Sequence, residues 1–147
     1  TTLSLDDTRE IIAALKRRFP AIVGPETDDI CYATQNRQNA VRELARQVDL
    51  VLVVGARNSS NSMRLREVAA QQGVSAHLVQ DEAGIDPAWV AGTRRIGVTA
   101  GASTPEVLVQ RVAQRLRELG VRDVRQAEGE DEGIVFRLPV ALLRRAA

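Results

Sequence analysis

The chain has 147 residues, of which 44% are hydrophobic and 27% charged, so it can build one core and is not globally disordered. The net charge of +1 gives no support for binding nucleic acid or an anionic membrane surface, and no apolar run is long enough to cross a bilayer. A single cysteine excludes an intrachain disulfide framework and is typical of a reducing, cytoplasmic location.

The first third of the chain carries two helical patterns separated by a polar loop. The first predicted helix begins with a capping-box-like pair, Ser4 and Asp7, and ends before Pro20. The polar stretch that follows, up to Asp29, is expected to be a domain junction. Apolar residues three and four apart then predict a second helix over residues 35–48, with Thr34 as its N-cap.

Strands and helices alternate through most of the remaining chain. The apolar runs predict strands at residues 50–54, 74–79, 95–99, 121–125 and 134–138. Helical patterns between them pass through residues 65–72, 87–90 and 107–119. Gly73 and Gly120 are predicted to end the first and last of these helices, and Asp86 to cap the second. The run at 50–54 is continuously apolar, which is typical of a strand covered on both faces. Right-handed crossovers then predict an α/β fold in which helices cover both faces of a parallel sheet, a three-layer unit.

Two of the predicted strands are followed by loops of the same character, and both loops are expected to lie on one rim of the sheet, outside the carboxyl ends of its strands. Gly55 leads to the run of Ser and Asn at 58–62, and Gly101 leads to Ala102, Ser103 and Thr104. Small residues, hydroxyls and a following helix N-terminus favour an anion, most often phosphate. The alternative is that these side chains only cap helices. Neither loop is a Walker or G-x-G-x-x-G motif, so nucleotide binding has no direct support.

The only cysteine, Cys31, lies just ahead of the second predicted helix, in the segment CYATQNRQ at residues 31–38. The field of a helix N-terminus favours a thiolate, the form that binds metal or attacks carbon. A lone cysteine can equally be a small buried hydrophobe. The only histidine, His77, falls inside a predicted strand and is interpreted as structural, so nucleophilic thiol chemistry lacks an evident base.

Three segments together resemble one family. The segments CYATQNRQ at 31–38, VLVVGARNSSNSMRL at 51–65 and VTAGASTPEVLV at 98–109 resemble 4-hydroxy-3-methylbut-2-enyl diphosphate reductase, the LytB-type iron–sulfur enzyme of the non-mevalonate isoprenoid pathway. The stretches TTLSLDD near the start and IVGPETDDICYAT at 22–34 are similar to that family as well. The similarity runs in the same order over nearly the whole chain.

The resemblance implies three similar α/β units around a [4Fe–4S] cluster held by one cysteine from each unit. It further implies reductive removal of an allylic hydroxyl with two electrons from a donor such as ferredoxin or flavodoxin. By this resemblance Cys31 is a metal ligand and Thr1 lies near the reacting hydroxyl. The positions implied to bind or line the diphosphate substrate are Thr34, Ser59, Ser60, Asn61 and Ser103.

The chain also departs from the family pattern. The two further cysteines that the cluster needs, the histidines that touch the diphosphate and the glutamate that delivers a proton have no counterpart here. We therefore interpret residues 1–28 as the end of a preceding α/β unit, 29–126 as the third unit and 127–147 as a C-terminal tail. The missing N-terminal half is an expected partner, and this chain alone is expected to be inactive. The alternative is a stand-alone phosphate- or diphosphate-binding module without catalysis.

Overall fold

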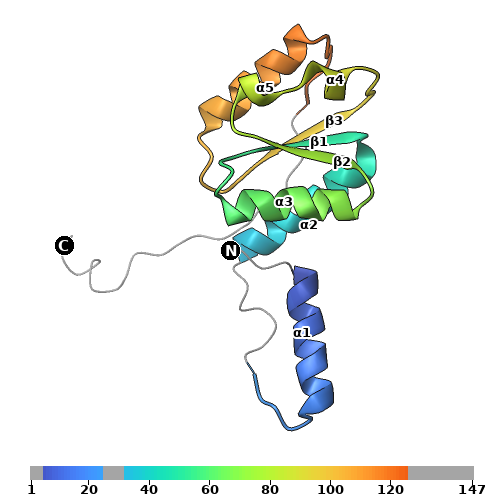
Figure 1. The fold of residues 1–147 in the computed structure, drawn as a ribbon, viewed down its shortest axis with the longest axis vertical. Coiled ribbons are helices and arrows are strands. Elements are labelled where there is room, and N and C mark those ends of the chain that lie inside the picture. The colour runs from blue at the N-terminus through green and yellow to red at the C-terminus, as the bar shows by residue number, and fades with distance from the viewer. Residues whose placement is uncertain (1–4, 25–31, 126–147) are drawn as a thin grey trace, which may run out of the picture.

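The computed structural model describes residues 5–24 and 32–125 (Figure 1). Sequence predictions for Thr1, Cys31 and the strand at 134–138 lie outside these residues. The elements in chain order are α1 (Leu5–Arg18), α2 (Tyr32–Gln47), β1 (Leu50–Val54), α3 (Ser60–Gln71), β2 (Ser75–Val79), the 3₁₀ helix η2 (Glu82–Gly84), α4 (Pro87–Val90), β3 (Ile96–Ala100) and α5 (Glu106–Glu118).

The three strands of the described residues form one parallel sheet in the order β2-β1-β3. In the register, Leu50 at the start of β1 lies beside Ser75 and Ile96, and Val54 at its end lies beside Val79 and Ala100. The predicted parallel α/β architecture is therefore confirmed. Because β1 is central, its five residues are all buried, as the continuous apolar run predicts.

Helices cover both faces of the sheet and give the molecule two hydrophobic cores (Figure 1). On one face, Val51 and Val53 pack with residues of α2 and α3 such as Val41 and Leu65. On the other, alternate β1 residues, including Leu52, pack with Ile85, which follows η2, and with residues of α4 and α5. Each fully buried Val or Leu contributes roughly 1.5–3 kcal/mol, so these cores dominate the stability of the unit.

Local sequence signals set the ends of several helices. The Asp86 side chain accepts a hydrogen bond from Ala88 N at 2.9 Å, which caps α4 as predicted. Gly73 and Gly120 follow α3 and α5 with φ of +84° and +100°. A residue with a side chain rarely adopts this left-handed conformation, so glycine ends both helices at these positions.

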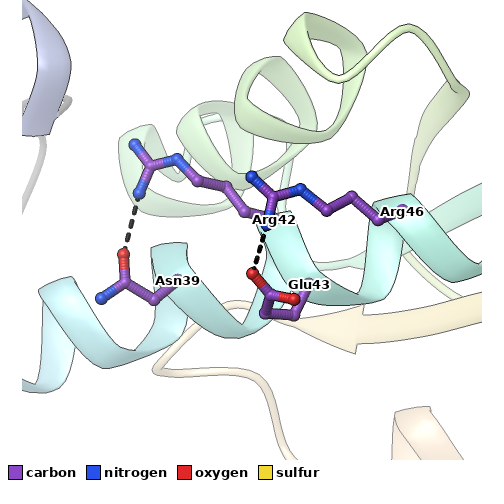
Figure 2. Close-up of polar contacts among 4 residues, drawn as sticks. All are labelled: Asn39, Arg42, Glu43 and Arg46. Carbon is purple, nitrogen blue, oxygen red and sulfur yellow. Dashed lines mark hydrogen bonds and ion pairs between the residues drawn. The ribbon is translucent and has the colours of Figure 1, made fainter.

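The outward face of α2 is polar and solvated. Arg42 donates to Asn39 Oδ1 at 2.9 Å, and Arg46 forms an ion pair with Glu43 at 2.6 Å (Figure 2). These pairs are three residues apart along the helix, and the exposed ion pair adds at most a few tenths of a kcal/mol. The orientation of α2 is set by its apolar side, where Val41 is buried against the sheet.

Two sequence predictions about local structure are wrong. Thr34 is not an N-cap, because α2 already begins at Tyr32 and Thr34 lies inside it, 5% exposed. Residues 121–125 form no strand. Val121 packs against the α5 side of the core, but Val124 and its charged neighbours are exposed, so this segment has no apolar face with which to join the sheet.

His77 lies in β2, as the sequence analysis places it, and stacks on Trp89. The ring centroids are 3.9 Å apart with an interplanar angle of 4°, and Ser75 Oγ lies 3.0 Å from His77 Nε2. Burial is the largest effect on this residue and lowers the pKa of His77 below its ordinary value of 6.5. The charge of Asp86 opposes that shift and the charge of Arg66 adds to it.

This shift predicts a dependence of stability on pH. The folded state binds a proton at His77 less tightly than the unfolded state does. The contribution of neutral His77 to the free energy of unfolding is therefore present above the unfolded pKa and is lost as pH falls through the folded pKa. We expect His77→Phe, which keeps a ring over Trp89, to lose less stability than the wild type between about pH 7.5 and 5.5. Urea unfolding at each pH measures this, and parallel curves for the two proteins would contradict it.

Candidate functional site

The candidate site lies where two neighbouring strands send their helices to opposite faces of the sheet. After β1 the chain enters α3 on the face shared with α2, whereas after β3 it enters α5 on the other face (Figure 1). Val54 and Ala100, the last residues of these strands, are register partners. In open α/β sheets, ligands bind in the crevice that this divergence creates at the carboxyl ends of the strands.

The loop from β1 to α3 places three serines at this crevice. Ser59 is the N-cap of α3, and its Oγ accepts a hydrogen bond from Ser62 N at 3.3 Å. Ser62 Oγ also donates to Ser59 Oγ at 3.0 Å. Ser60 is the first residue of α3 and is exposed. Helix capping, the alternative interpretation of this loop, thus explains Ser59 and Ser62. Ser60 has no capping role.

The two loops meet at the side chain of Ser62, which is 1% exposed. A Cβ added to Gly55 or to Gly101 would lie 2.2 Å from Ser62 Oγ in either case. Thr104 ties the second loop to the first strand, because its Oγ1 donates to Val54 O at 3.0 Å. The predicted proximity of the two hydroxyl-rich loops is therefore confirmed, and glycine is needed at both strand ends because the backbones approach a buried hydroxyl.

Two further residues of the predicted site lie in these loops. The Nδ2 atom of Asn61 is buried and has no hydrogen-bond partner among the described residues. A buried amide without a partner is costly, and a ligand that accepts a hydrogen bond removes that cost. Ser103 is exposed in the second loop, and α5 begins after Pro105 without a side-chain cap. Capping therefore does not account for Ser103.

Arg37 is a residue of this site that the sequence analysis missed. Its guanidinium donates to Ala100 O at 2.9 Å and is partly buried, so α2 is fastened to the end of β3. Arg37 belongs to the CYATQNRQ segment, and this bond brings that segment to the same edge of the sheet. The sequence feature that could have marked Arg37 as a site residue is its position among polar residues in that segment. Its positive charge lies on the side of the sheet where an anion is expected.

Two cavities lie at opposite ends of the sheet. One of about 350 Å³ lies beside the first turn of α3 and is lined by Arg57, Asn58, Ser60, Met63, Arg64 and Glu67. Arg64 is engaged there, since it forms ion pairs with Asp7 at 3.2 Å and Glu67 at 2.8 Å. A cavity of about 840 Å³ adjoins Arg95 and Ile96 at the amino-terminal ends of the strands, remote from the serine loops.

The chain by itself does not fit a four-iron cluster. Such clusters are held by several cysteine thiolates, and this sequence has one cysteine. Within residues 5–24 and 32–125, no group of three or more His, Cys, Asp or Glu residues could hold a metal ion. Cys31 is the residue that precedes α2 in the sequence, so it remains a candidate for one ligand and no more. In the same described ranges, no helix is both long and apolar enough to span a membrane.

Comparison with known proteins gives the family. The model of the family described as "LytB protein" matches residues 1–117. The chain belongs to the LytB family. It is 61% identical over 145 residues to 4-hydroxy-3-methylbut-2-enyl diphosphate reductase of Xanthomonas axonopodis pv. citri, covering 99% of this chain and 46% of that protein. It is 64% identical over 142 residues to 4-hydroxy-3-methylbut-2-enyl diphosphate reductase 2 of Burkholderia mallei, covering 97% and 44%.

Solved structures agree with the LytB assignment. The E-1-hydroxy-2-methyl-but-2-enyl-4-diphosphate reductase of Plasmodium falciparum matches 99% of this chain and 46% of its own chain, with a TM-score of 0.81 and 32% identity. A second solved structure, described as the terminal enzyme of the non-mevalonate pathway, matches 80% of this chain with a TM-score of 0.58 and 30% identity. The chain thus spans a little under half the length of the relatives it matches.

The contact between Ser62 and the two glycines predicts a pattern of coupling between substitutions. We expect Gly101→Ala to reduce the free energy of unfolding by about 1–3 kcal/mol, because its Cβ would overlap Ser62 Oγ. In a Ser62→Ala background most of this cost should be relieved, since the nearest remaining atoms are Thr104 Oγ1 at 3.2 Å and Ser62 Cβ at 3.4 Å.

Gly55→Ala is the matched control for this coupling. Its Cβ would lie 2.8 Å from Ser62 Cβ, so removing the Ser62 hydroxyl should not relieve the overlap. Urea unfolding of the single and double variants measures both coupling energies. Equal relief at Gly55 and Gly101, or relief at neither, would show that Ser62 Oγ is not the contact that fixes this strand end.

Proposed function

We propose that this chain is the diphosphate-binding part of an enzyme that converts 4-hydroxy-3-methylbut-2-enyl diphosphate to isopentenyl and dimethylallyl diphosphate by reductive dehydroxylation. The observation that carries the proposal is the meeting of two hydroxyl-rich loops at the Ser62 side chain, in a LytB chain 61–64% identical to reductases of that name. The substrate's diphosphate group is an anion that accepts several hydrogen bonds, which is what such a crevice can bind.

In this proposal the residues of the two loops hold the diphosphate. Ser59, Ser60 and Asn61 bind it from the first loop, and Ser103 binds it from the second. The partnerless amide of Asn61 and the uncapped helix after Ser103 support these roles. Thr34 is proposed to line the same cavity from α2. The N-terminus of α3, a helix of 12 residues, adds a partial positive charge. Together these contacts fix the substrate's position, so that its hydroxyl end reaches the reacting centre.

The reacting centre is proposed to be shared with a part of the protein outside this chain. Cys31 supplies one ligand to a [4Fe–4S] cluster, and two further cysteines come from the missing N-terminal half. When bound, that cluster supplies the electrons for the reduction, which it receives from a donor such as ferredoxin or flavodoxin. Thr1 is proposed to lie near the substrate hydroxyl. The chain alone is therefore expected to be inactive.

The surface of α1 supports the division into an end of a preceding unit (1–28), a third unit (29–126) and a tail (127–147). Ile11, Leu15 and Phe19 are spaced four apart and are 57%, 41% and 54% exposed. Figure 1 shows α1 apart from the layers that surround the sheet. An apolar helix face of this kind is stable when another element covers it. We propose that the missing half of the enzyme covers it.

The ligand role of Cys31 is tested in an assembled enzyme. We expect the chain, co-expressed with the part of the Burkholderia mallei relative that it does not match, to form a complex with visible iron–sulfur absorbance and reductase turnover. Cys31→Ala should abolish both, whereas the control Ser75→Ala, at the amino-terminal end of β2, should retain them. Full iron content and turnover with Cys31→Ala would reject the ligand role. A wild-type complex that binds pyrophosphate but takes up no iron and shows no turnover would favour the stand-alone anion-binding module.

The α1 surface is tested in the same complex by placing a charge on either side of the helix. Ile11→Asp introduces an unpaired carboxylate into the proposed interface and should weaken the complex by about tenfold or more. Ala13→Asp introduces the same charge about 200° around the helix from Ile11, at an exposed position, and should leave the affinity unchanged. Analytical ultracentrifugation gives both dissociation constants. Equal effects of the two substitutions would show that the Ile11 side of α1 is not the interface.

A further inference from the structure

We propose that the ion pair between Asp7 and Arg64 is a positioning contact that sets the missing half of the enzyme against the start of α3. This inference rests on the proposed function, because it concerns how the two halves meet at their shared reacting centre. Both residues act by fixing the direction of α1, and neither contacts the reacting atoms. The sequence analysis interpreted Asp7 as part of a helix start and did not single out Arg64.

The ion pair joins α1 to the unit that contains the sheet. Arg64 Nη1 lies 3.2 Å from Asp7 Oδ2 and 2.8 Å from Glu67 Oε2, so carboxylates of two helices share one guanidinium nitrogen. The Arg64 side chain is 22% exposed, which limits the screening of the pair by solvent. Because Glu67 is three residues along α3 from Arg64, it holds the guanidinium where Asp7 meets it.

The position of Arg64 on α3 connects this ion pair with the candidate site. Arg64 follows Ser60 by four residues, so the two side chains share one face of the helix. Both also line the cavity of about 350 Å³ beside the first turn of α3. The start of α1 is therefore attached close to the loop that follows β1, at the carboxyl-terminal edge of the sheet.

Within the described residues, only the beginning of α1 is covered. Asp7, Thr8 and Ile12 are partly buried, whereas residues 13–24 are all exposed. Figure 1 shows the helix running away from the sheet layers from its dark-blue first turn. The apolar side chains that we propose meet the missing half follow Asp7 at steps of four residues, each about 40° further around the helix. One side of α1 thus contacts α3 at its start and offers its apolar remainder to the missing half.

The direction of α1 matters for the reaction because the helix is long. From Asp7 to Phe19 it extends about 18 Å, so a tilt of about 10° at the first turn would move Phe19 by about 3 Å. A misplacement of about 1 Å between reacting groups can already lower a rate about 100-fold. In the proposed enzyme this chain binds the diphosphate and the other half completes the reacting centre. The ion pair then sets the distance between the two.

The test uses the complex of this chain with the part of the Burkholderia mallei relative that it does not match. We expect Asp7→Arg and Arg64→Asp each to raise the dissociation constant of the complex by about tenfold, because α1 is no longer held in its bound direction. At saturating partner concentration, each should lower kcat per bound cluster by about tenfold or more and change KM by less than about twofold. Analytical ultracentrifugation gives the dissociation constants, and iron–sulfur absorbance gives the amount of bound cluster.

A double variant separates the ion pair from other effects of the two substitutions. Asp7→Arg also disturbs the start of α1, where the helix dipole favours a carboxylate. Combining it with Arg64→Asp restores opposite charges at positions 7 and 64 and should recover most of both losses, which a helix-dipole effect would not do. The matched control is Glu118→Lys, which reverses one charge of an exposed ion pair on α5, with Arg115 at 3.0 Å. It should behave as the wild type does.

The outcomes separate this inference from the proposed function. Wild-type dissociation constants and wild-type kcat per cluster in both single variants would reject the positioning role and leave the proposed function standing. Losses in the single variants without recovery in the double variant would also reject it. A lowered melting temperature with both other quantities unchanged would assign the pair a structural role only. A wild-type complex without iron–sulfur absorbance or turnover would overturn the proposed function and this inference with it.

Discussion

The pairing of β1 with a parallel strand on each side is the constraint on which the rest of the molecule depends. It buries β1 completely and brings the ends of β1 and β3 into register. The helices that follow these two strands pack on opposite faces, so the loops after Val54 and Ala100 start side by side and then diverge. Every feature of the candidate site, from the serine cap to the paired glycines, is placed by that divergence.

The crevice combines rigidity with unfilled hydrogen-bonding capacity. Thr104 and Arg37 bind the backbone carbonyls at the ends of β1 and β3, so both loops start from fixed points. Ser62 fills the space between the loops, which makes small residues necessary at both strand ends. The buried Asn61 amide without a partner and the exposed Ser60 and Ser103 hydroxyls are the groups that we propose bind the diphosphate.

The LytB relatives are about twice as long as this chain, and the physical properties of the chain agree with a shared function. One thiolate cannot hold a four-iron cluster, and α1 exposes apolar side chains that an isolated domain would bury. The α/β unit nevertheless has two cores of its own on the two faces of its sheet. We therefore propose that this unit binds the diphosphate and that the other half of the enzyme completes the centre that reduces the substrate.

The sequence by itself determined the elements whose signals are local. The run at 50–54 predicted a buried central strand, Asp86 predicted a helix cap, and Gly73 and Gly120 predicted helix ends, because each depends on burial or on backbone conformation at one place. The sequence also indicated both hydroxyl-rich loops and, by resemblance, the family. The predicted strand at 121–125 failed because its charged residues offer no apolar face, a property that local β-propensity does not weigh.

Only the tertiary structure decided how the site is assembled. Arg37 reaches Ala100 across 63 positions of sequence, and Thr104 reaches Val54 across 50. The role of Ser62 depends on two strand ends that approach the same oxygen, which no local pattern encodes. The residue types could therefore be predicted from their order along the chain, whereas their contacts could not, because strand order and the faces that helices cover are set by packing over the whole sheet.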